Sequence, residues 1–280
     1  MSSFQLLNYD PVSQYPMGEG IYLGLPDETY FAHHAVSNSQ LKVFSTKSPA
    51  HLKYGERNET RAQSFGKLMH CGILEPEDFE KRFMASDATR VGTKEWDADV
   101  ARAAGRQVVK RPEFEEALRL RDTVLGRPGV LRDLVLHPAC TKEFAFFWRD
   151  PVTGVECRGK ADGALLEHGI GFDLKSCEDA GEKFMSSVRE YRYHWQNAFY
   201  CDGLAALDAP LEEFLFIAIE KTYPYQYQAW DLPRWLIAKA RERYQDTLIE
   251  YAKCLHNDVW PGYRQNIQTL PYPERWAQYE

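Results

Sequence analysis

The segment GFDLKSC, residues 171–177, places an aspartate and a lysine two positions apart within a run of strand-forming residues. Side chains two apart in a strand point to the same face of a sheet, so Asp173 and Lys175 share one face. Phe172 and Leu174 alternate with them and are apolar, which predicts that the opposite face packs in the core. A carboxylate beside an ammonium group indicates either a structural ion pair or part of a catalytic site.

A second carboxylate is predicted to lie beside Asp173. Asp162 falls in the preceding predicted strand (155–166), and a turn at 167–170 folds that strand back beside the next one. Two adjacent carboxylates repel each other unless a cation lies between them, and an oxygen-rich site suits Mg²⁺ or Mn²⁺ better than zinc. Lys175 could then orient the attacking water or stabilise charge on a phosphate. These three residues alone favour the simpler interpretation, an ion pair and a turn aspartate, because short motifs recur by chance.

Three other polar side chains occur in apolar helical segments. His70 lies between Met69 and Cys71 in the predicted helix 62–74. A histidine in such a place is usually a hydrogen-bonded core residue, although it can also bind a metal. Gln196 and Tyr200 are four residues apart and therefore share one face of a predicted helix. They could equally be a surface glutamine and a packed tyrosine.

The hydrophobic pattern predicts an α+β fold with one mixed central sheet. Loops and short extended pieces are expected over 1–36, and Ser37 with Gln40 forms a capping box that begins a helix. The remaining expected elements are helices through 138, a meander of three strands (141–150, 155–166, 170–177), helices 178–190 and 192–207, strands 213–221 and 225–232, and a long helix 233–255. We expect one domain over 1–280, with a mostly helical lead-in (1–138), an αβ catalytic core (139–255) and a tail (256–280).

The charge distribution offers a candidate surface for DNA. The formal net charge of −7 argues mildly against a nucleic-acid partner, because DNA binding depends on neutralising phosphates. The segment 41–67 is nevertheless basic, and either a DNA-tracking surface or a solvated helix face explains it. Its basic residues are Lys42, Lys47, Lys53, Arg57, Arg61 and Lys67. The sequence shows neither a run of apolar residues long enough to span a bilayer nor a signal peptide, so we expect a cytoplasmic protein without a membrane partner.

The ordered set of polar residues resembles a known superfamily. His70, Asp162 in GKAD, DLK at 173–175 and Gln196-x-x-x-Tyr200 together resemble the RecB-like branch of the PD-(D/E)XK nucleases. Upstream phrases such as SFGKLMHCGILEPEDFEKRF and VGTKEW resemble RecE-type exonuclease VIII of phages and prophages, and the likeness runs over at least residues 20–235. One departure is that alanine replaces the proline of the superfamily name before Asp162, as is common in this branch.

The resemblance implies a PD-(D/E)XK core, with a mixed central sheet flanked by helices, and a role for each matching residue. Asp162, Asp173, His70 and the carbonyl of Leu174 would hold Mg²⁺, for which Mn²⁺ may substitute, and Lys175 would be the catalytic lysine. Gln196 and Tyr200 would position DNA or the site itself. Glu143, on the first strand of the meander, is a candidate for an outer-shell role.

The resemblance also implies an activity. We expect an ATP-independent exodeoxyribonuclease that digests linear double-stranded DNA from its ends, 5′→3′, and leaves 3′ single strands for a phage-type annealing protein in a bacterial cytoplasm. Such enzymes typically form homo-oligomeric rings, so the resemblance also implies a ring here. The sequence contains no G-x-x-x-x-G-K-[ST] motif for ATP and no clustered cysteines for an iron–sulfur cluster. A non-catalytic DNA-binding or phage-interaction protein with the same fold, and a structure-specific or restriction-type endonuclease, are the alternatives.

Overall fold

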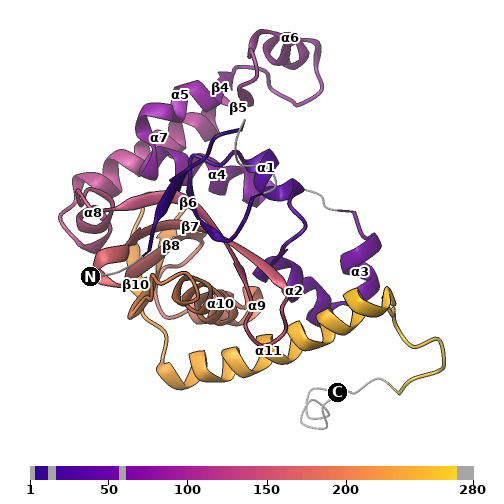
Figure 1. Ribbon diagram of the computed structural model, residues 1–280. Helices are drawn as coiled ribbons and strands as arrows, with labels where there is room; N and C mark the ends of the chain where they lie inside the picture. The colour runs from indigo at the N-terminus through magenta and orange to yellow at the C-terminus, as the bar shows by residue number, and fades with distance from the viewer. Residues whose placement is uncertain (1–3, 12–16, 57–60, 270–280) are drawn as a thin grey trace, which may run out of the picture.

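A mixed β-sheet forms the centre of the protein in the computed structural model, which describes residues 4–11, 17–56 and 61–269 (Figure 1). Within these residues the sheet has eight strands in the order β1-β2-β6-β7-β8-β9-β10, with β3 paired to β7. The strands are β1 (Leu6–Asn8), β2 (Gly20–Leu23), β3 (Val36–Ser37), β6 (Thr141–Arg149), β7 (Glu156–Leu165), β8 (Ile170–Cys177), β9 (Glu213–Glu220) and β10 (Tyr227–Trp230). The predicted mixed sheet flanked by helices is confirmed.

Helices cover both faces of this sheet (Figure 1). On one face, α4 (Arg61–Leu74), α7 (Arg111–Gly126) and α8 (Val130–Val135) share a hydrophobic cluster with β8 and β9. On the other face, α2 (Asn38–Thr46), α10 (Tyr193–Ala205) and α11 (Arg234–Asn257) share a second cluster with β6 and β7. The short helices are α1 (Asp27–Ala32), α3 (Pro49–Tyr54), α5 (Phe79–Arg82), α6 (Lys94–Arg102) and α9 (Phe184–Tyr191).

The strand β8 divides its side chains between the two faces as its alternation predicts. Phe172 and Leu174 belong to the α4 cluster, together with Met69 and Ile73 of α4. Because β8 and β9 are parallel, the chain must cross over between them, and α9 and α10 form this crossover. The crossover places α10 over the face that carries Asp173.

The N-terminal half contributes more sheet than the sequence suggested. β2 pairs with β6 and β3 pairs with β7, so two segments read as loop or helix cap extend the central sheet. The predicted capping box is present, since the Ser37 hydroxyl accepts from the Gln40 N–H and the Gln40 side chain accepts from the Ser37 N–H. The segment 90–138, expected to be mostly helical, also contains a strand, β5 (Gln107–Lys110).

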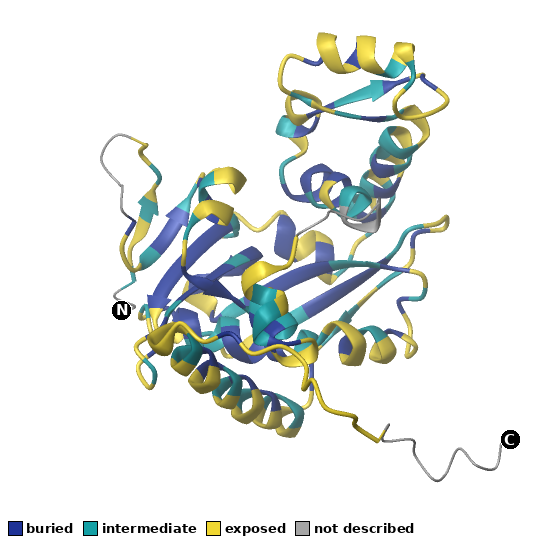
Figure 2. Cartoon of the chain, turned by 90° about the vertical axis from the view of Figure 1, so that its right-hand side faces the viewer, coloured by how far each residue is buried: buried dark blue, intermediate teal, exposed yellow. Residues whose placement is uncertain are grey.

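A small lobe projects from the main body (Figure 2). It consists of a two-stranded parallel sheet, β4 (Phe83–Ser86) and β5 (Gln107–Lys110), with α6 between the strands. Phe79, Phe83 and Val109 pack with Leu68 of α4, which ties the lobe to the helix that carries His70. Among the described residues, no helix has the length and apolar character needed to cross a membrane.

Two glycines allow aromatic rings to lie directly over β7. A Cβ atom at Gly159 would overlap the ring of Phe146, and one at Gly163 would overlap the ring of Phe172. Gly163 and Phe172 are also cross-strand partners, and Asp162 and Asp173 are their immediate neighbours in sequence. The close packing of this pair therefore determines how the two aspartates approach each other.

Replacing Gly163 with alanine should destabilise the protein and displace the aspartates. The added methyl group has no room beside Phe172, and overpacking of this kind typically costs about 1–3 kcal/mol. Urea unfolding monitored by circular dichroism measures the loss. Gly126→Ala at the end of α7, where a Cβ would meet no atom within 4 Å, is the matched control and should leave the free energy of unfolding unchanged or slightly higher. Equal stabilities of the two variants would contradict the packing argument.

Candidate metal-dependent active site

Three acidic residues lie in one row across three neighbouring antiparallel strands. Glu143 of β6 faces Asp162 of β7, because the flanking residues pair as Lys142 with Gly163 and Phe144 with Ala161. Asp162 in turn lies one step beyond the β7–β8 pair formed by Gly163 and Phe172, which brings it opposite Asp173. The hairpin predicted from the sequence therefore brings Asp162 and Asp173 together, and it adds Glu143 to them.

His70 completes a compact group with two of these carboxylates. Its Nδ1 lies 3.1 Å from Oδ1 of Asp162. One ligand atom each from His70, Glu143 and Asp162 lies within 4.8 Å of the others, which is close enough for all three to hold one metal ion. His70 reaches this position because its neighbours Met69 and Cys71 are buried and fix the rotation of α4.

Glu143 takes an unusual backbone conformation at this point. Its φ is 47°, in the left-handed region that residues other than glycine rarely adopt, and such conformations concentrate at functional sites. The Glu143 carboxylate lies 3.2 Å from the ammonium of Lys160, which also pairs at 2.6 Å with Asp27 of α1. The expected outer-shell residue is thus part of the same group as His70 and Asp162.

Lys160 was missed in the sequence. It lies two residues before Asp162 in GKAD and could have been found by the same alternation that relates Asp173 to Lys175. Asp27 gave no local signal, because it is separated from its partner by more than a hundred residues.

The second carboxylate oxygen of Asp162 is bound to the backbone of β8. Oδ2 accepts a hydrogen bond of 2.6 Å from the Leu174 N–H. The N–H and C=O of one strand residue point to the same edge of the strand, so the Leu174 carbonyl also faces the β7 side. This orientation is compatible with the predicted carbonyl ligand.

Asp173 points toward α10 and is held there by two groups. Its Oδ1 accepts a hydrogen bond from the side-chain amide of Gln196, and its Oδ2 pairs with the Lys175 ammonium. The Lys175 ammonium also makes a cation–π contact with Tyr193, 4.5 Å from the centre of the ring. Tyr200 contacts the backbone of the neighbouring strand β7, since its hydroxyl donates to the carbonyl of Lys160 at 2.9 Å. Tyr200 therefore supports the strand that carries Asp162.

Burial and the mutual repulsion of the carboxylates shift the pKa values of this group. Burial and the neighbouring Asp162 charge raise the pKa of Glu143 to about 7, and the same two causes raise the pKa of Asp173. Burial opposes protonation of His70, but the Asp162 carboxylate outweighs it and raises the pKa of His70 to about 9. The carboxylates are the oxygen donors that Mg²⁺ or Mn²⁺ prefers, and a divalent cation would relieve their mutual repulsion.

The basic residues predicted to track DNA do not form one surface. Lys42 lies within α2, Lys47 follows the last residue of α2, and Lys53 is in α3, which packs against α2, whereas Lys67 is in α4, whose hydrophobic cluster is a different one (Figure 1). Lys53 lies 3.9 Å from Asp258 and over the Trp260 ring, beyond the end of α11.

The two arginines of that set cannot be placed. Arg57 lies outside the described residues, and Arg61 begins α4 with a side chain that is not described. The single basic face thus remains a prediction for which the described lysines give no common surface.

Comparison with known proteins identifies the fold. A family model described as "PDDEXK-like domain of unknown function (DUF3799)" matches residues 37–271. The crystal structure of a "Putative exonuclease" from Eubacterium rectale superposes with a TM-score of 0.62 and 12% sequence identity, over 90% of this chain and 97% of its own. At this identity the likeness shows the fold alone. No curated protein matches the sequence. These findings confirm the predicted superfamily, whereas the nearer resemblance to RecE-type exonucleases stays a prediction.

Metal binding should release protons and strengthen as the pH rises from 7 to 9. Both raised pKa values mean that His70 is protonated and Glu143 partly protonated at pH 7 without metal, and a metal ion requires both side chains deprotonated. Calorimetric titration with Mn²⁺ in buffers of different ionisation enthalpy counts the released protons. A pH-independent affinity across this range would contradict the assignment.

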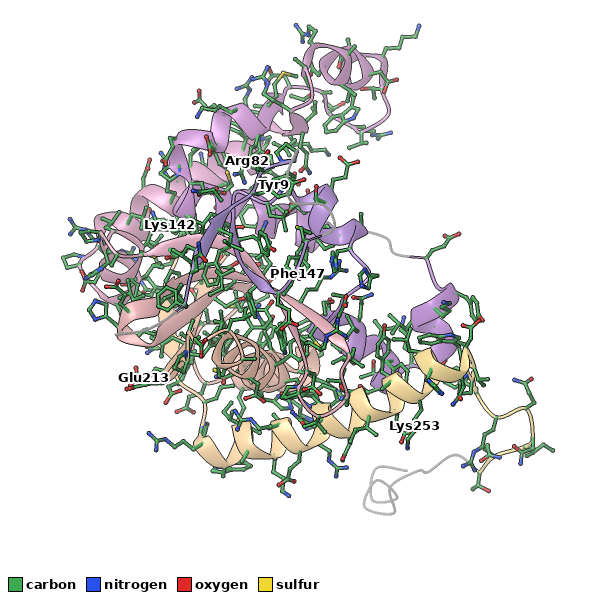
Figure 3. All side chains as sticks on the ribbon, viewed as in Figure 1. Tyr9, Arg82, Lys142, Phe147, Glu213 and Lys253 are labelled. Carbon is green, nitrogen blue, oxygen red and sulfur yellow. The ribbon has the colours of Figure 1, made fainter. Side chains whose placement is uncertain are left out.

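Glu143→Gln tests the contribution of that residue to the proton count. The variant should release fewer protons and bind Mn²⁺ more weakly, because an amide offers no charge and no titrating proton. Glu213→Gln on β9, an exposed position labelled in Figure 3, is the control and should match the wild type.

Proposed function

The chain belongs to the family of PDDEXK-like domains named DUF3799, and from this premise we propose that it is a metal-dependent deoxyribonuclease. The observation that carries the proposal is the meeting of His70, Glu143 and Asp162 beside the Asp173–Lys175 pair on this nuclease fold.

The residues divide the chemistry between them. His70, Glu143, Asp162 and the Leu174 carbonyl would hold Mg²⁺ or Mn²⁺, with Asp173 as a further ligand once its contacts rearrange. When bound, the metal would activate water and neutralise the leaving oxygen of a phosphodiester.

Lys175 supplies a permanent positive charge at the edge of this group. Burial opposes its charge, but Asp173 outweighs burial and keeps the pKa of Lys175 above its usual value, so the ammonium stays protonated and can bind the phosphate oxygens. Gln196 orients Asp173, and Tyr200 fixes the strand behind Asp162.

We further propose the finer activity that the sequence resemblance implies. The enzyme would be an ATP-independent exonuclease that digests linear double-stranded DNA 5′→3′ and leaves a 3′ strand for an annealing partner in phage-type recombination. A ring of identical subunits would keep it on the strand, and it would act in the bacterial cytoplasm.

Digestion of end-labelled linear duplex DNA tests the activity and its direction together. With Mg²⁺ the protein should release a 5′ label before a 3′ label and leave closed circular DNA intact, and EDTA should abolish digestion. Cutting of closed circles would instead indicate an endonuclease. Failure to digest linear and nicked duplexes with either Mg²⁺ or Mn²⁺ would refute the nuclease proposal.

Asp173→Asn should abolish this digestion, because the amide neither carries the negative charge that a metal requires nor pairs with Lys175. Asp231→Asn, at an exposed position before α11, is the matched control and should digest DNA like the wild type. Full activity in Asp173→Asn would remove this residue from the site.

Lys175→Ala should lower cleavage while leaving metal binding intact. Loss of one stabilising donor to a charged transition state typically costs about 10²- to 10³-fold in turnover. The comparison is made over a range of pH, because loss of the Lys175 charge would raise the pKa of Asp173 further. Loss of Mn²⁺ affinity in this variant would show that Lys175 organises the ligands instead.

A further inference from the structure

A hollow of about 590 Å³ lies outside the acidic group, where four elements meet. Its lining residues are Ser45 of α2, Arg189 of α9, Arg192 between α9 and α10, His194 and Trp195 of α10, and Arg243, Asp246 and Thr247 of α11. The hollow contains three arginines and one carboxylate. In a protein with a formal net charge of −7, this is a local concentration of positive charge.

The central arginine is held in place from both sides. Arg192 has a φ of 55° at the junction between the helices, which turns α10 away from α9. Its guanidinium lies 4.4 Å from the centre of the Trp195 ring and donates to the Ser45 hydroxyl at 3.0 Å. A guanidinium has five N–H donors in a planar fork that matches phosphate oxygens. Fixing it in this way lowers the entropic cost of binding an anion.

The beginning of α10 adds to the attraction for anions. This helix of 13 residues begins at Tyr193 without a side-chain cap, next to His194 and Trp195 of the hollow, and the Trp195 N–H donates to the Arg192 carbonyl. The N-terminus of a helix favours negative charge, and phosphates bind at such ends.

Aromatic rings connect the hollow to the catalytic lysine. Lys175 lies against Tyr193, and the Tyr193 ring stacks on the Tyr191 ring with centroids 5.7 Å apart. Tyr191 is exposed, and the Lys42 ammonium lies 4.9 Å from its ring centre. Positive groups alternating with an exposed aromatic ring are the arrangement that binds single-stranded nucleic acid, with phosphates on the cations and a base on the ring.

We propose that this hollow and Tyr191 hold a single strand of the DNA substrate next to the scissile phosphate. Phosphates would lie on Arg189, Arg192 and Arg243, and one unpaired base would replace the Lys42 ammonium on the face of the Tyr191 ring that Tyr193 does not cover. The proposal rests on the nuclease function and assigns a strand-binding site to it. Asp246 and the nearby Glu190 partly offset the positive charge, so the arginines act as a cluster and none acts alone.

A double variant, Arg189→Gln with Arg243→Gln, tests the hollow. Both positions are exposed, so the fold should tolerate the change. The control is Lys239→Gln with Lys253→Gln, which removes the same charge from exposed positions on α11, where Figure 3 labels Lys253. Binding of a fluorescein-labelled single-stranded oligonucleotide is followed by anisotropy in EDTA, where no cleavage occurs, over a series of salt concentrations.

The double variant should bind the oligonucleotide about tenfold more weakly, with a salt slope smaller by about 1.4, the value for two lost phosphate contacts on a single strand. Hydrolysis of bis(p-nitrophenyl) phosphate with Mn²⁺ should be unchanged, because this small diester does not reach the hollow. The control should match the wild type in both measurements. Equal affinity and salt slope in the two double variants would overturn the proposal.

Tyr191→Ala tests the stacking contribution separately. It should weaken binding about tenfold, a typical loss for one stacked base, without changing the salt slope. Unchanged affinity would overturn the stacking.

If the wild-type protein binds the strand through the arginines but cleaves no DNA, the nuclease proposal fails and the binding site stands. If it cleaves DNA and the arginine variant is unaffected, the binding site fails and the nuclease stands.

Discussion

The carboxylate of Asp162 makes the contacts on which the candidate site depends. One oxygen faces the His70 imidazole of α4 and the other accepts the Leu174 N–H of β8, while the residue itself belongs to β7. A buried carboxylate is strongly unfavourable unless it is paired and hydrogen-bonded. The three elements must therefore assemble together, since removing α4 or β8 would leave one of the two Asp162 oxygens without its partner in the protein interior.

The strand β8 shows how one segment serves both packing and chemistry. Phe172 and Leu174 join the α4 cluster, which fixes the position of β8 relative to α4. Asp173 and Lys175 face α10 on the opposite side. Because Phe172 packs onto the bare backbone of Gly163, a change in the core would be transmitted directly to the neighbouring aspartates. The precision of the site thus follows from dense packing rather than from the polar residues alone.

The sequence predicted the parts of the site that alternation and hairpin geometry determine. Asp162 and Asp173 meet because consecutive antiparallel strands bring them opposite each other, and period two places Lys175 beside Asp173. For Glu143 the sequence predicted only an outer-shell role, since a positive φ within a strand cannot be recognised from one sequence. Arg189 and Arg192 of the hollow are three residues apart, but Arg243 comes more than fifty residues later, so no single run of charge predicted the cluster. The described lysines of the basic run 41–67, in contrast, are distributed over α2, α3 and α4.

The charges at the centre balance without a metal, which explains how the protein can fold around them. Glu143, Asp162 and Asp173 are matched by Lys160, Lys175 and the protonated His70, so burial does not isolate an uncompensated charge. With a divalent cation bound, His70 would hold it in the deprotonated form, and Lys175 would supply positive charge for a phosphate beside it. The acidic group and the arginine hollow thus have separate electrostatic tasks, because a phosphate would be repelled by the former until metal has bound and attracted by the latter throughout.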